Sequence, residues 1–485
     1  MNQGMSAIKS ITGRITEQEN LSRALKSNEA ELIAIYGRRR VGKTYLIRKY
    51  YEKQMIFEFS GVHNAKLKDQ LINFRNTLSI LLKQQVNPEV PENWTAAFEM
   101  LKLYAAPLLK KEKCVIFLDE FPWLSSAKSS FLPAFEYFWN SWASKHQNMI
   151  VVICGSAASW MIQKIVNNRG GLHNRITRKI RLLPFTLSET EAYLKKNQVN
   201  LDRYQISLLY MAVGGIPQYL KDIRAGESAA QNIDRMCFAK DGFLRDEFQN
   251  LYQSLFAQAD KHTAIVRALA DKPSGLTRKE IINTCSLTTG GTTTQLLEEL
   301  TESGFISAYL PFEKNLRDSI YKLTDEFSRF HLKFIENARA SGAGTWLKLS
   351  TSPSWRSWSG TAFESVCMKH IKEIKQALGI SGIYSEESIW RYAPGKSGTG
   401  TQIDLLLDRA DFCISLCEMK FSTSPFTIDK TYAEQLKNKA QIFQQITKTN
   451  KTIFTVMVTT YGTKDNIYKT GLVQNDIQLN DLFQT

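Results

Sequence analysis

The sequence predicts a multidomain α/β protein with an N-terminal, doubly wound parallel sheet. The first observation is length, because the chain has 485 residues and a single hydrophobic core stops growing at about 250 to 300 residues. The second is that short apolar segments alternate with helical patterns near the N-terminus, the order that parallel strands with crossover helices require. The third is a change of pattern further on, first to short helices with a hairpin and then to a second α/β arrangement. We expect domains at residues 1–185, 186–245, 246–340 and 341–485.

A glycine-containing loop follows the first of the predicted strands. These strands are residues 31–36, 56–60, 114–118, 149–154 and 181–185. The loop has the spacing G-x-x-x-x-G-K-[ST], in which glycines let successive backbone N–H groups curl around phosphates at the positive end of a helix. It consists of Gly37, Arg38, Arg39, Arg40, Val41, Gly42, Lys43 and Thr44. In such a loop the lysine reaches the β- and γ-phosphates and the hydroxyl ligates Mg²⁺, so we expect binding of ATP with Mg²⁺.

Polar side chains follow two other predicted strands of this sheet. Asp119 and Glu120 end the apolar run 114–118, and Ser156 follows residues 149–154. Because ligands bind at the carboxyl ends of strands in open α/β sheets, we expect these side chains beside the loop. Asp119 would hold Mg²⁺, Glu120 would polarise the attacking water, and Ser156 would sense the γ-phosphate or the water. Without the loop, two acids after an apolar run more often mark a surface turn.

Four motifs together resemble a known family. GRRRVGKT, FLDEFPWL, ICGSAASWM and GGIPQYL look like the archaeal-type ATPase family within the AAA+ and STAND-related P-loop proteins, over residues 1–240. The resemblance implies that Glu120 is the hydrolytic glutamate, Ser156 the sensor and Arg175 the candidate arginine finger, acting in cis or on a neighbouring copy in a homo-oligomer. It also implies a small helical lid around Gly214–Pro217 after the sheet. The alternative for Arg175 is a solvated charge in a basic loop.

The middle of the chain resembles a winged helix-turn-helix. Helical apolar spacing occurs over residues 262–270, 276–281 and 291–300, and residues 304–310 and 319–323 fit a hairpin. The third helix carries side chains that can contact DNA, namely Thr292, Thr293, Thr294 and Gln295. It also carries Glu298 and Glu299, which duplex DNA would repel. Contact with DNA and a role as a packing or protein-contact module both stay open.

The C-terminal part shows a second candidate site. Glu364 lies on a predicted helix over residues 360–371, and residues 401–408 and 412–420 fit a hairpin that brings Asp404 towards Glu418. Period-two geometry puts Glu418 and Lys420 on one face of their strand. Neighbouring carboxylates bind Mg²⁺ through oxygen, and a lysine steadies negative charge developing on phosphate. We expect Glu364, Asp404 and Glu418 as metal ligands, with Asp404, Glu418 and Lys420 catalytic.

This C-terminal set resembles the PD-(D/E)xK nuclease signature, in a restriction-endonuclease-like domain often fused to archaeal-type ATPases. The resemblance implies a metal-dependent endonuclease. Two other interpretations stay open: an ordinary edge hairpin whose surface Glu and Lys pair across solvent, and a nuclease fold that has lost its activity.

Composition limits the partners. A formal net charge of +15 favours a polyanionic partner, and nucleic acid is the commonest one, so we expect DNA. Membrane phosphates and an excess of lysine that only aids solubility are the alternatives. Seven cysteines without a C-x-x-C pair indicate neither a disulfide framework nor a zinc site. No apolar stretch reaches the about 18 residues of a membrane span, so we expect a cytoplasmic protein without a membrane partner.

Together these features predict an ATPase that couples ATP turnover to Mg²⁺-dependent binding or cleavage of nucleic acid. The alternative is a nucleotide-gated switch or regulator that binds DNA or a protein without cutting. A third hypothesis is a chaperone-like ATPase that acts on proteins and uses the winged helix for assembly.

Overall fold

The computed structural model describes residues 11–82, 88–110, 112–126, 128–166, 170–172, 174–338, 342–393 and 400–484. They fall into two compact units, divided between Leu183 and Pro184, and each unit is described by itself. The first predicted domain boundary, after residue 185, lies next to this division. The boundaries predicted after residues 245 and 340 lie inside the second unit and stay predictions.

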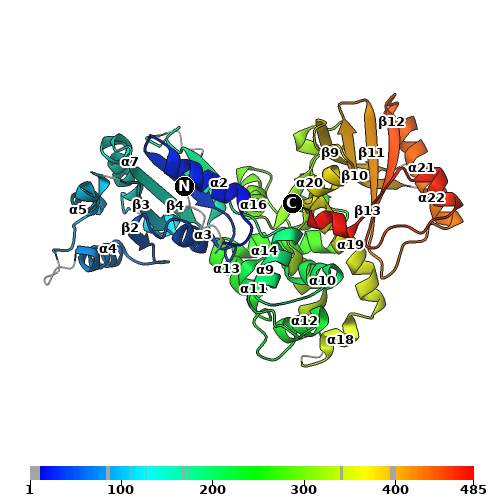
Figure 1. Cartoon of the computed structure of the whole chain (residues 1–485), viewed down its shortest axis with the longest axis horizontal. Helices are drawn as coiled ribbons and strands as arrows, with labels where there is room; N and C mark the ends of the chain where they lie inside the picture. Colours follow the sequence, from blue (N-terminus) through cyan, green and yellow to red (C-terminus); the bar gives the residue numbers. More distant parts are fainter. Residues whose placement is uncertain are drawn as a thin grey trace. The chain divides into compact units, whose positions relative to one another are not determined.

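The first unit is built on a five-stranded, all-parallel sheet (Figure 1). Its strands, in spatial order, are β2 (Met55–Ser60), β3 (Cys114–Asp119), β4 (Met149–Gly155), β1 (Glu31–Tyr36) and β5 (Arg178–Arg181). The central strands β3 and β4 are buried along their whole length, as expected of parallel strands covered on both faces. The predicted parallel α/β sheet is therefore confirmed.

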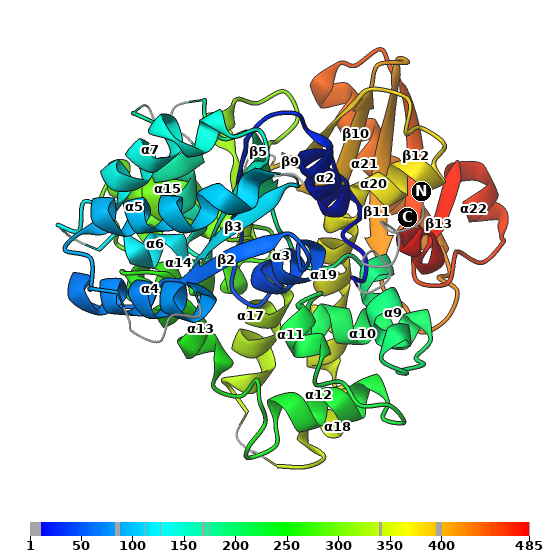
Figure 2. The same cartoon turned by 60° about the vertical axis from the view of Figure 1, so that its left-hand side comes forward.

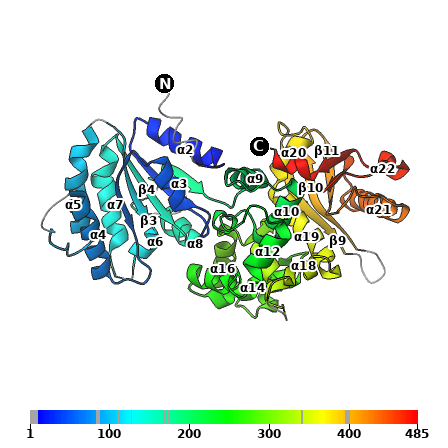
Figure 3. The same cartoon turned by 60° about the horizontal axis from the view of Figure 1, so that its bottom comes forward.

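Helices cover both faces of this sheet (Figure 3). On one face lie α4 (Leu67–Leu82), α5 (Trp94–Ala105) and α7 (Phe131–Ser141), whose aromatic side chains form one core with β2, β3 and β4. On the other face lie α2 (Ile15–Lys26) and α3 (Lys43–Tyr50), which follows β1 directly. Short helices α6 (Phe121–Leu124) and α8 (Ala158–Met161) follow β3 and β4.

The fifth strand lies earlier in the sequence than we predicted. Residues 178–181 pair with β1, whereas the apolar run 182–185 leaves the sheet after the Leu182 amide donates to the Tyr36 carbonyl. β5 is an edge strand in which only Ile180 is buried. Because its other residues are polar, the strand does not appear as an apolar run in the sequence. Pro184, which has no amide proton, cannot continue the ladder.

The second unit begins with short helices and continues with a small mixed segment. The helices are α9 (Leu187–Lys196), α10 (Arg203–Val213), α11 (Pro217–Leu220), α12 (Ala229–Cys237) and α13 (Glu247–Leu255). The segment consists of α14 (Ala259–Asp271), β6 (Leu276–Thr277), α15 (Arg278–Thr284), α16 (Gly291–Glu302), β7 (Ile306–Tyr309) and β8 (Ile320–Leu323). Its antiparallel sheet has the order β6-β8-β7.

The predicted helix over residues 276–281 starts later than expected. Leu276 and Thr277 pair with β8 as a short strand, and Thr277 then caps α15 in a capping box with Glu280. A Thr followed three residues later by Glu marks a helix start, so the correct boundary was readable from the sequence.

A second five-stranded sheet follows, in the order β13-β12-β11-β10-β9 (Figure 2). Its strands are β9 (Ser385–Tyr392), β10 (Thr401–Arg409), β11 (Cys413–Lys420), β12 (Thr452–Thr459) and β13 (Asn475–Gln478). The pairs β9–β10 and β10–β11 are antiparallel, and β11–β12 and β12–β13 are parallel. The predicted hairpin over residues 401–420 is present as β10 and β11.

Further helices complete the second unit. They are α17 (Glu326–Phe330) with the π-helical turn His331–Ile335, α18 (Thr345–Leu349), α19 (Pro353–Lys369), α20 (Ile371–Ala377), α21 (Lys430–Thr447) and α22 (Ile467–Leu472). α19 packs against β11, and Phe443 of α21 is fully buried with Trp390, Ile403 and Leu416 of the sheet. α19 starts seven residues before the predicted position 360, because Ser352 caps it and Pro353 occupies its first turn.

The loop between β7 and β8 packs against the edge of this second sheet. Pro311 forms a parallel bridge with Ile389 of β9, and the Phe312 amide donates to the Ile389 carbonyl at 2.9 Å. The Phe312 ring also packs against Phe443, with 5.4 Å between ring centroids. An exposed strand edge invites pairing with other chains, and this loop covers part of that edge. Among the described residues, no helix is long and apolar enough to cross a membrane.

Candidate functional site

The loop between β1 and α3 is shaped by two glycines. Gly37 has φ +147°, and a Cβ atom there would lie 2.3 Å from the Leu182 carbonyl oxygen. Gly42, with φ +93°, precedes the first residue of α3 in the left-handed region. Any side chain at residue 37 would push the loop away from the chain after β5, so glycine is required there.

Lys43 lies folded back onto this loop. Its Nζ donates to the carbonyl oxygens of Gly37 at 2.9 Å and Arg38 at 2.8 Å, and only 7% of the residue is exposed. Burial lowers the pKa of Lys43, while the charges of Glu120 and Asp119 act in the opposite direction. The ammonium group is thus held inside the loop by carbonyl oxygens, which a phosphate can replace as acceptor.

Thr44 and Asp119 join the loop to the end of β3. The Thr44 hydroxyl donates to Oδ2 of Asp119 at 2.7 Å, and Oδ1 of Asp119 accepts from the Glu120 amide at 2.9 Å. Asp119 is 6% exposed. A hydroxyl oxygen and a carboxylate oxygen side by side match the oxygen ligands that Mg²⁺ prefers.

Glu120 is held by Ser156 from the end of β4. Its Oε2 accepts from the Ser156 hydroxyl at 2.8 Å and from the Ser156 amide at 3.2 Å. Glu120 has φ +44°, a conformation that costs energy in a residue other than glycine and is often found at functional sites. The structure therefore brings Lys43, Thr44, Asp119, Glu120 and Ser156 together at one edge of the sheet.

The arginines of the loop and Arg175 have different surroundings. Arg38 is 2% exposed, the Arg39 guanidinium lies 5.6 Å from the centre of the Trp123 ring, and Arg40 adopts φ +71°. Val41 is buried, and its carbonyl accepts from Arg14. Arg175 is exposed on a turn after Leu172, and its role as an arginine finger stays a prediction.

In the second unit, Glu418 of β11 is surrounded by donors. Lys420 Nζ lies 3.0 Å from its Oε1 and Lys439 Nζ lies 2.7 Å from its Oε2, while the Tyr432 hydroxyl donates to Oε1 at 3.0 Å. Burial raises the pKa of Glu418, but the two lysines outweigh burial and hold it below its usual value. Glu418 is thus a buried, ionised carboxylate.

Asp404 lies beside Glu418 at the end of the β10–β11 ladder, one residue beyond the pair Leu405–Cys417. Burial and the charges of Glu364 and Glu418 raise the pKa of Asp404 to about 7, against the opposing effect of Lys439 and Lys322. Glu364 of α19 accepts from Lys322 Nζ at 3.1 Å. The four predicted residues Glu364, Asp404, Glu418 and Lys420 therefore belong to one electrostatic cluster.

The metal-binding role of Glu364, Asp404 and Glu418 stays a prediction. Among the described residues, no three His, Cys, Asp or Glu side chains are grouped closely enough to hold a metal ion. Lysines pair with two of the predicted ligands, since Lys322 engages Glu364 and two lysines engage Glu418. A cation would have to displace these ammonium groups.

Sequence reasoning missed three members of the cluster, Tyr432, Lys439 and Lys322. The first two stand seven residues apart on α21, so they share a helix face, and this spacing was visible in the sequence. Lys322 lies on β8, far along the chain from the cluster's other members, and no local pattern indicates its contact with Glu364.

Only some of the side chains predicted to contact DNA from helix α16 are exposed. Thr293 is 1% exposed and its hydroxyl donates to the Thr288 carbonyl, so it cannot contact DNA from this position. Thr292, Thr294 and Gln295 are exposed. Glu299 binds His262, with 2.7 Å between Oε2 and Nε2.

Comparison with known proteins finds a similarity in the first part of the chain. Residues 12–223 match the model of an ATPase domain predominantly from Archaea. The match covers less than half of the chain, and it supports nucleotide binding and hydrolysis by this part.

Relatives and solved structures are also similar to this chain. The uncharacterized protein MJECL04 of Methanocaldococcus jannaschii is 25% identical over 399 residues, which are 81% of this chain and 83% of that protein. The uncharacterized ATP-binding protein MJ0423 of the same organism is 48% identical over 52 residues, 11% of this chain and 88% of that protein.

Two solved structures resemble the chain with low identity. The Walker-type ATPase PABY2304 of Pyrococcus abyssi has a TM-score of 0.48 and 16% identity, and the match covers 67% of this chain and 96% of that one. The ORC2 protein of Aeropyrum pernix, in its ADPNP-ADP complexes, has a TM-score of 0.38 and 17% identity, covering 67% and 93%.

The raised pKa of Asp404 predicts a pH-dependent stability. In the folded state Asp404 keeps a proton that the unfolded chain has released. Its contribution to the free energy of unfolding is therefore present at low pH and is lost as the pH rises to about 7. Asp404→Asn, which mimics the protonated form, should therefore gain stability over the wild type from about pH 4 up to about pH 7 and then level off. Thermal unfolding of both proteins in EDTA measures this difference.

Asp429→Asn, at an exposed helix cap, is the matched control because asparagine also caps helices. A gain for Asp404→Asn that stays constant over the whole pH range would contradict a raised pKa.

Proposed function

We propose that the first unit is an Mg²⁺-dependent ATPase whose chemistry is carried by Lys43, Thr44, Asp119, Glu120 and Ser156. The observation that carries this proposal is the 2.7 Å hydrogen bond between Thr44 and Asp119. It places the two oxygen donors for Mg²⁺ side by side at the start of α3 and the end of β3. When bound there, Mg²⁺ would neutralise charge on the phosphates.

Lys43 and the loop amides bind the phosphates. The ammonium group leaves the carbonyls of Gly37 and Arg38 and takes the β- and γ-phosphate oxygens, which are stronger acceptors because they are charged. The N-terminus of α3 adds the positive end of its helix dipole. Because Lys43 is buried, this exchange occurs away from water and its electrostatic effect is strong.

Glu120 acts as the base that orients and activates the attacking water. Its Oε2 is held by Ser156, so the hydroxyl fixes the direction of the carboxylate and leaves Oε1 for the water. Ser156 is therefore a positioning residue in this proposal. Arg175 remains the candidate for an arginine finger, in its own site or in that of a neighbouring copy.

Substitution of Lys43 tests this proposal. Lys43→Ala should reduce ATP turnover by about 10²- to 10³-fold, the usual loss on removing one electrostatic contact to the reacting group. Lys49→Ala is the matched control and should keep wild-type turnover, because Lys49 lies on the same helix, is partly exposed and pairs with Glu52. Unchanged hydrolysis in Lys43→Ala would refute the assignment.

A second candidate function is cleavage of nucleic acid by the cluster around Asp404. Three features support it: the order α19, α20, β9, β10, β11, α21, β12, carboxylates on β10, β11 and α19, and Lys420 beside Glu418. Asp404, Glu418 and Glu364 would hold Mg²⁺ in exchange for their lysine partners, the ion would supply activation of water, and Lys420 would steady negative charge on the phosphate. The net charge of +15 supports DNA as the substrate.

We propose that the segment from α14 to β8 is a winged helix that serves mainly as a connecting module. The element order α14, β6, α15, α16, β7, β8 supports the fold. Its loop at Pro311 and Phe312 is engaged by β9, and acidic side chains lie on α16. Both features favour packing over DNA contact for this segment.

Cleavage assays separate the second candidate from the alternative of a nucleotide-gated regulator. With ATP and Mg²⁺, the wild type should cut duplex or single-stranded DNA, and Asp404→Ala should lower the rate by at least about 10²-fold. Asp429→Asn should cut like the wild type. If the wild type leaves both DNAs intact, cleavage is rejected and a regulator that binds without cutting becomes the better description.

A further inference from the structure

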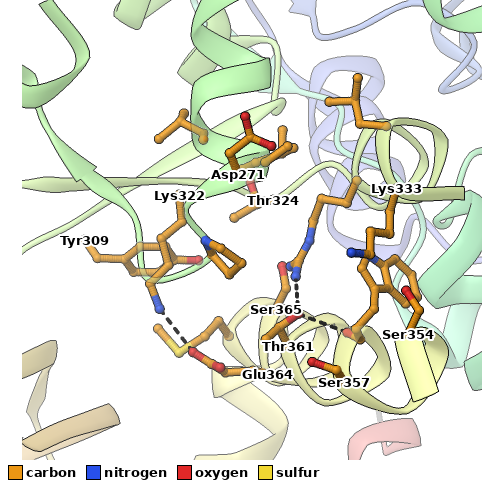
Figure 4. A pocket seen from close by; sticks show the side chains of 18 residues that line it. Asp271, Tyr309, Lys322, Thr324, Lys333, Ser354, Ser357, Thr361, Glu364 and Ser365 are labelled. Carbon is orange, nitrogen blue, oxygen red and sulfur yellow. Dashed lines mark hydrogen bonds and ion pairs between the residues drawn. The ribbon is translucent and has the colours of Figure 1, made fainter. Parts of the chain in front are cut away.

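A cavity of about 470 Å³ lies in the second unit, apart from the residues that make up the ATPase site. Its walls come from the end of α14, from β7 and β8, from α17 with the following turn, and from α19. Figure 4 shows Lys322 and Glu364 facing each other on one side, with Lys333 and Ser354 on the other. On one side of the cavity Lys322 and Glu364 neutralise each other, whereas the other side carries the positive charge of Lys333.

The basic side contains Arg329, a cation without a close counter-ion. In the described part of the chain its guanidinium forms no ion pair, and its hydrogen bond goes to the Thr361 hydroxyl at 3.1 Å. The two nearby acids are occupied elsewhere, since Glu326 pairs with Lys369 at 2.5 Å and Glu364 with Lys322 at 3.1 Å. Burial lowers the pKa of Arg329, but a guanidinium stays charged in proteins. Because Arg329 is partly buried, its charge is stabilised when an anion binds close to it.

α19 presents a row of hydroxyls to the same cavity. Ser354, Ser357, Thr361 and Ser365 all line it, and their spacing of three and four residues puts them on one helix face. Ser365 is 8% exposed, and within the described residues its Oγ has no hydrogen-bond partner. A buried hydroxyl without a partner is unusual and indicates that a ligand supplies the missing bond.

We propose that this cavity binds a small phosphate ester, with Arg329 and Lys333 binding the phosphate oxygens and the hydroxyls of α19 donating further hydrogen bonds. Guanidinium, ammonium and hydroxyl groups are the donors that a phosphate accepts best. Lys333 is exposed and has no ion pair among the described residues, so it is available to the ligand. Of the two acids in the lining, Glu364 is neutralised by Lys322 and Asp271 is exposed.

The cavity is larger than a phosphate ion alone needs. Its volume is within the range of about 300 to 1,000 Å³ found for small-molecule sites, and the Trp358 and Tyr309 rings add apolar surface. The ligand is therefore a phosphate joined to an organic group of mononucleotide size. A free mononucleotide and the 5′-phosphorylated end of a nucleic acid share this chemistry.

Calorimetric titration tests the proposal on the full chain with its ATPase site saturated with Mg²⁺ and ADP. The probes are inorganic phosphate, AMP, and one oligonucleotide with and without a 5′-phosphate. Saturable binding of AMP indicates a free nucleotide, and binding of the oligonucleotide only when it is phosphorylated indicates a nucleic-acid end. Either result supports the site if Arg329→Gln and Lys333→Gln weaken it by at least about tenfold, as expected on losing a charged hydrogen bond.

Arg356→Gln is the matched control, because Arg356 is an exposed arginine on α19 that does not line this cavity. It should bind like the wild type. Lys333→Gln keeps the test decisive if Arg329→Gln fails to fold, since residue 333 is exposed. The proposal is overturned if no probe binds, or if Lys333→Gln and every folded Arg329→Gln sample bind as tightly as the wild type.

Discussion

The hydrogen bond between Thr44 and Asp119 is the constraint on which the nucleotide site depends. β1 and β3 are not neighbours, because β4 lies between them, so the loop after β1 has to reach across one strand. Gly37 lets the start of the loop pack directly against the Leu182 carbonyl, which follows β5 on the other side of β1, and Gly42 turns the chain into α3. The strand order and two glycines thus accompany the meeting of Thr44 and Asp119, and Glu120 and Ser156 lie nearby because β3 and β4 end at the same edge.

Strands and the phosphate-binding loop could be predicted from the sequence where neighbouring residues form the pattern. Buried parallel strands such as β3 and β4 are continuous apolar runs, and the loop motif specifies both its own shape and its chemistry. Local patterns failed at β5, where an edge strand carries polar residues, and at α19, where the apolar pattern starts later than the cap at Ser352. The shared sheet edge predicted that Ser156 lies near Glu120, whereas the contact of Lys322 with Glu364 could not be predicted, because it depends on the packing of distant segments.

Lysines pair with two of the three carboxylates in the C-terminal cluster of Glu364, Asp404 and Glu418. They compensate the charges of Glu418 and Glu364, while Asp404, which lacks such a partner, holds its proton up to about pH 7. Buried carboxylates are costly unless paired, so the ammonium groups stabilise this arrangement until another cation replaces them. The same Lys322–Glu364 pair borders the cavity with Arg329.

The substitution Glu120→Gln tests whether Glu120 activates water while Lys43, Thr44 and Asp119 bind the nucleotide. Glutamine keeps the size of the side chain and can still accept the hydrogen bond from Ser156, but it cannot take a proton. ATP affinity and the rate of ATP hydrolysis should be measured on the same samples. We expect affinity to stay within about threefold of the wild type while turnover falls by about 10²- to 10⁴-fold, the range for loss of a general base. Wild-type turnover in Glu120→Gln would show that Glu120 does not act as the base.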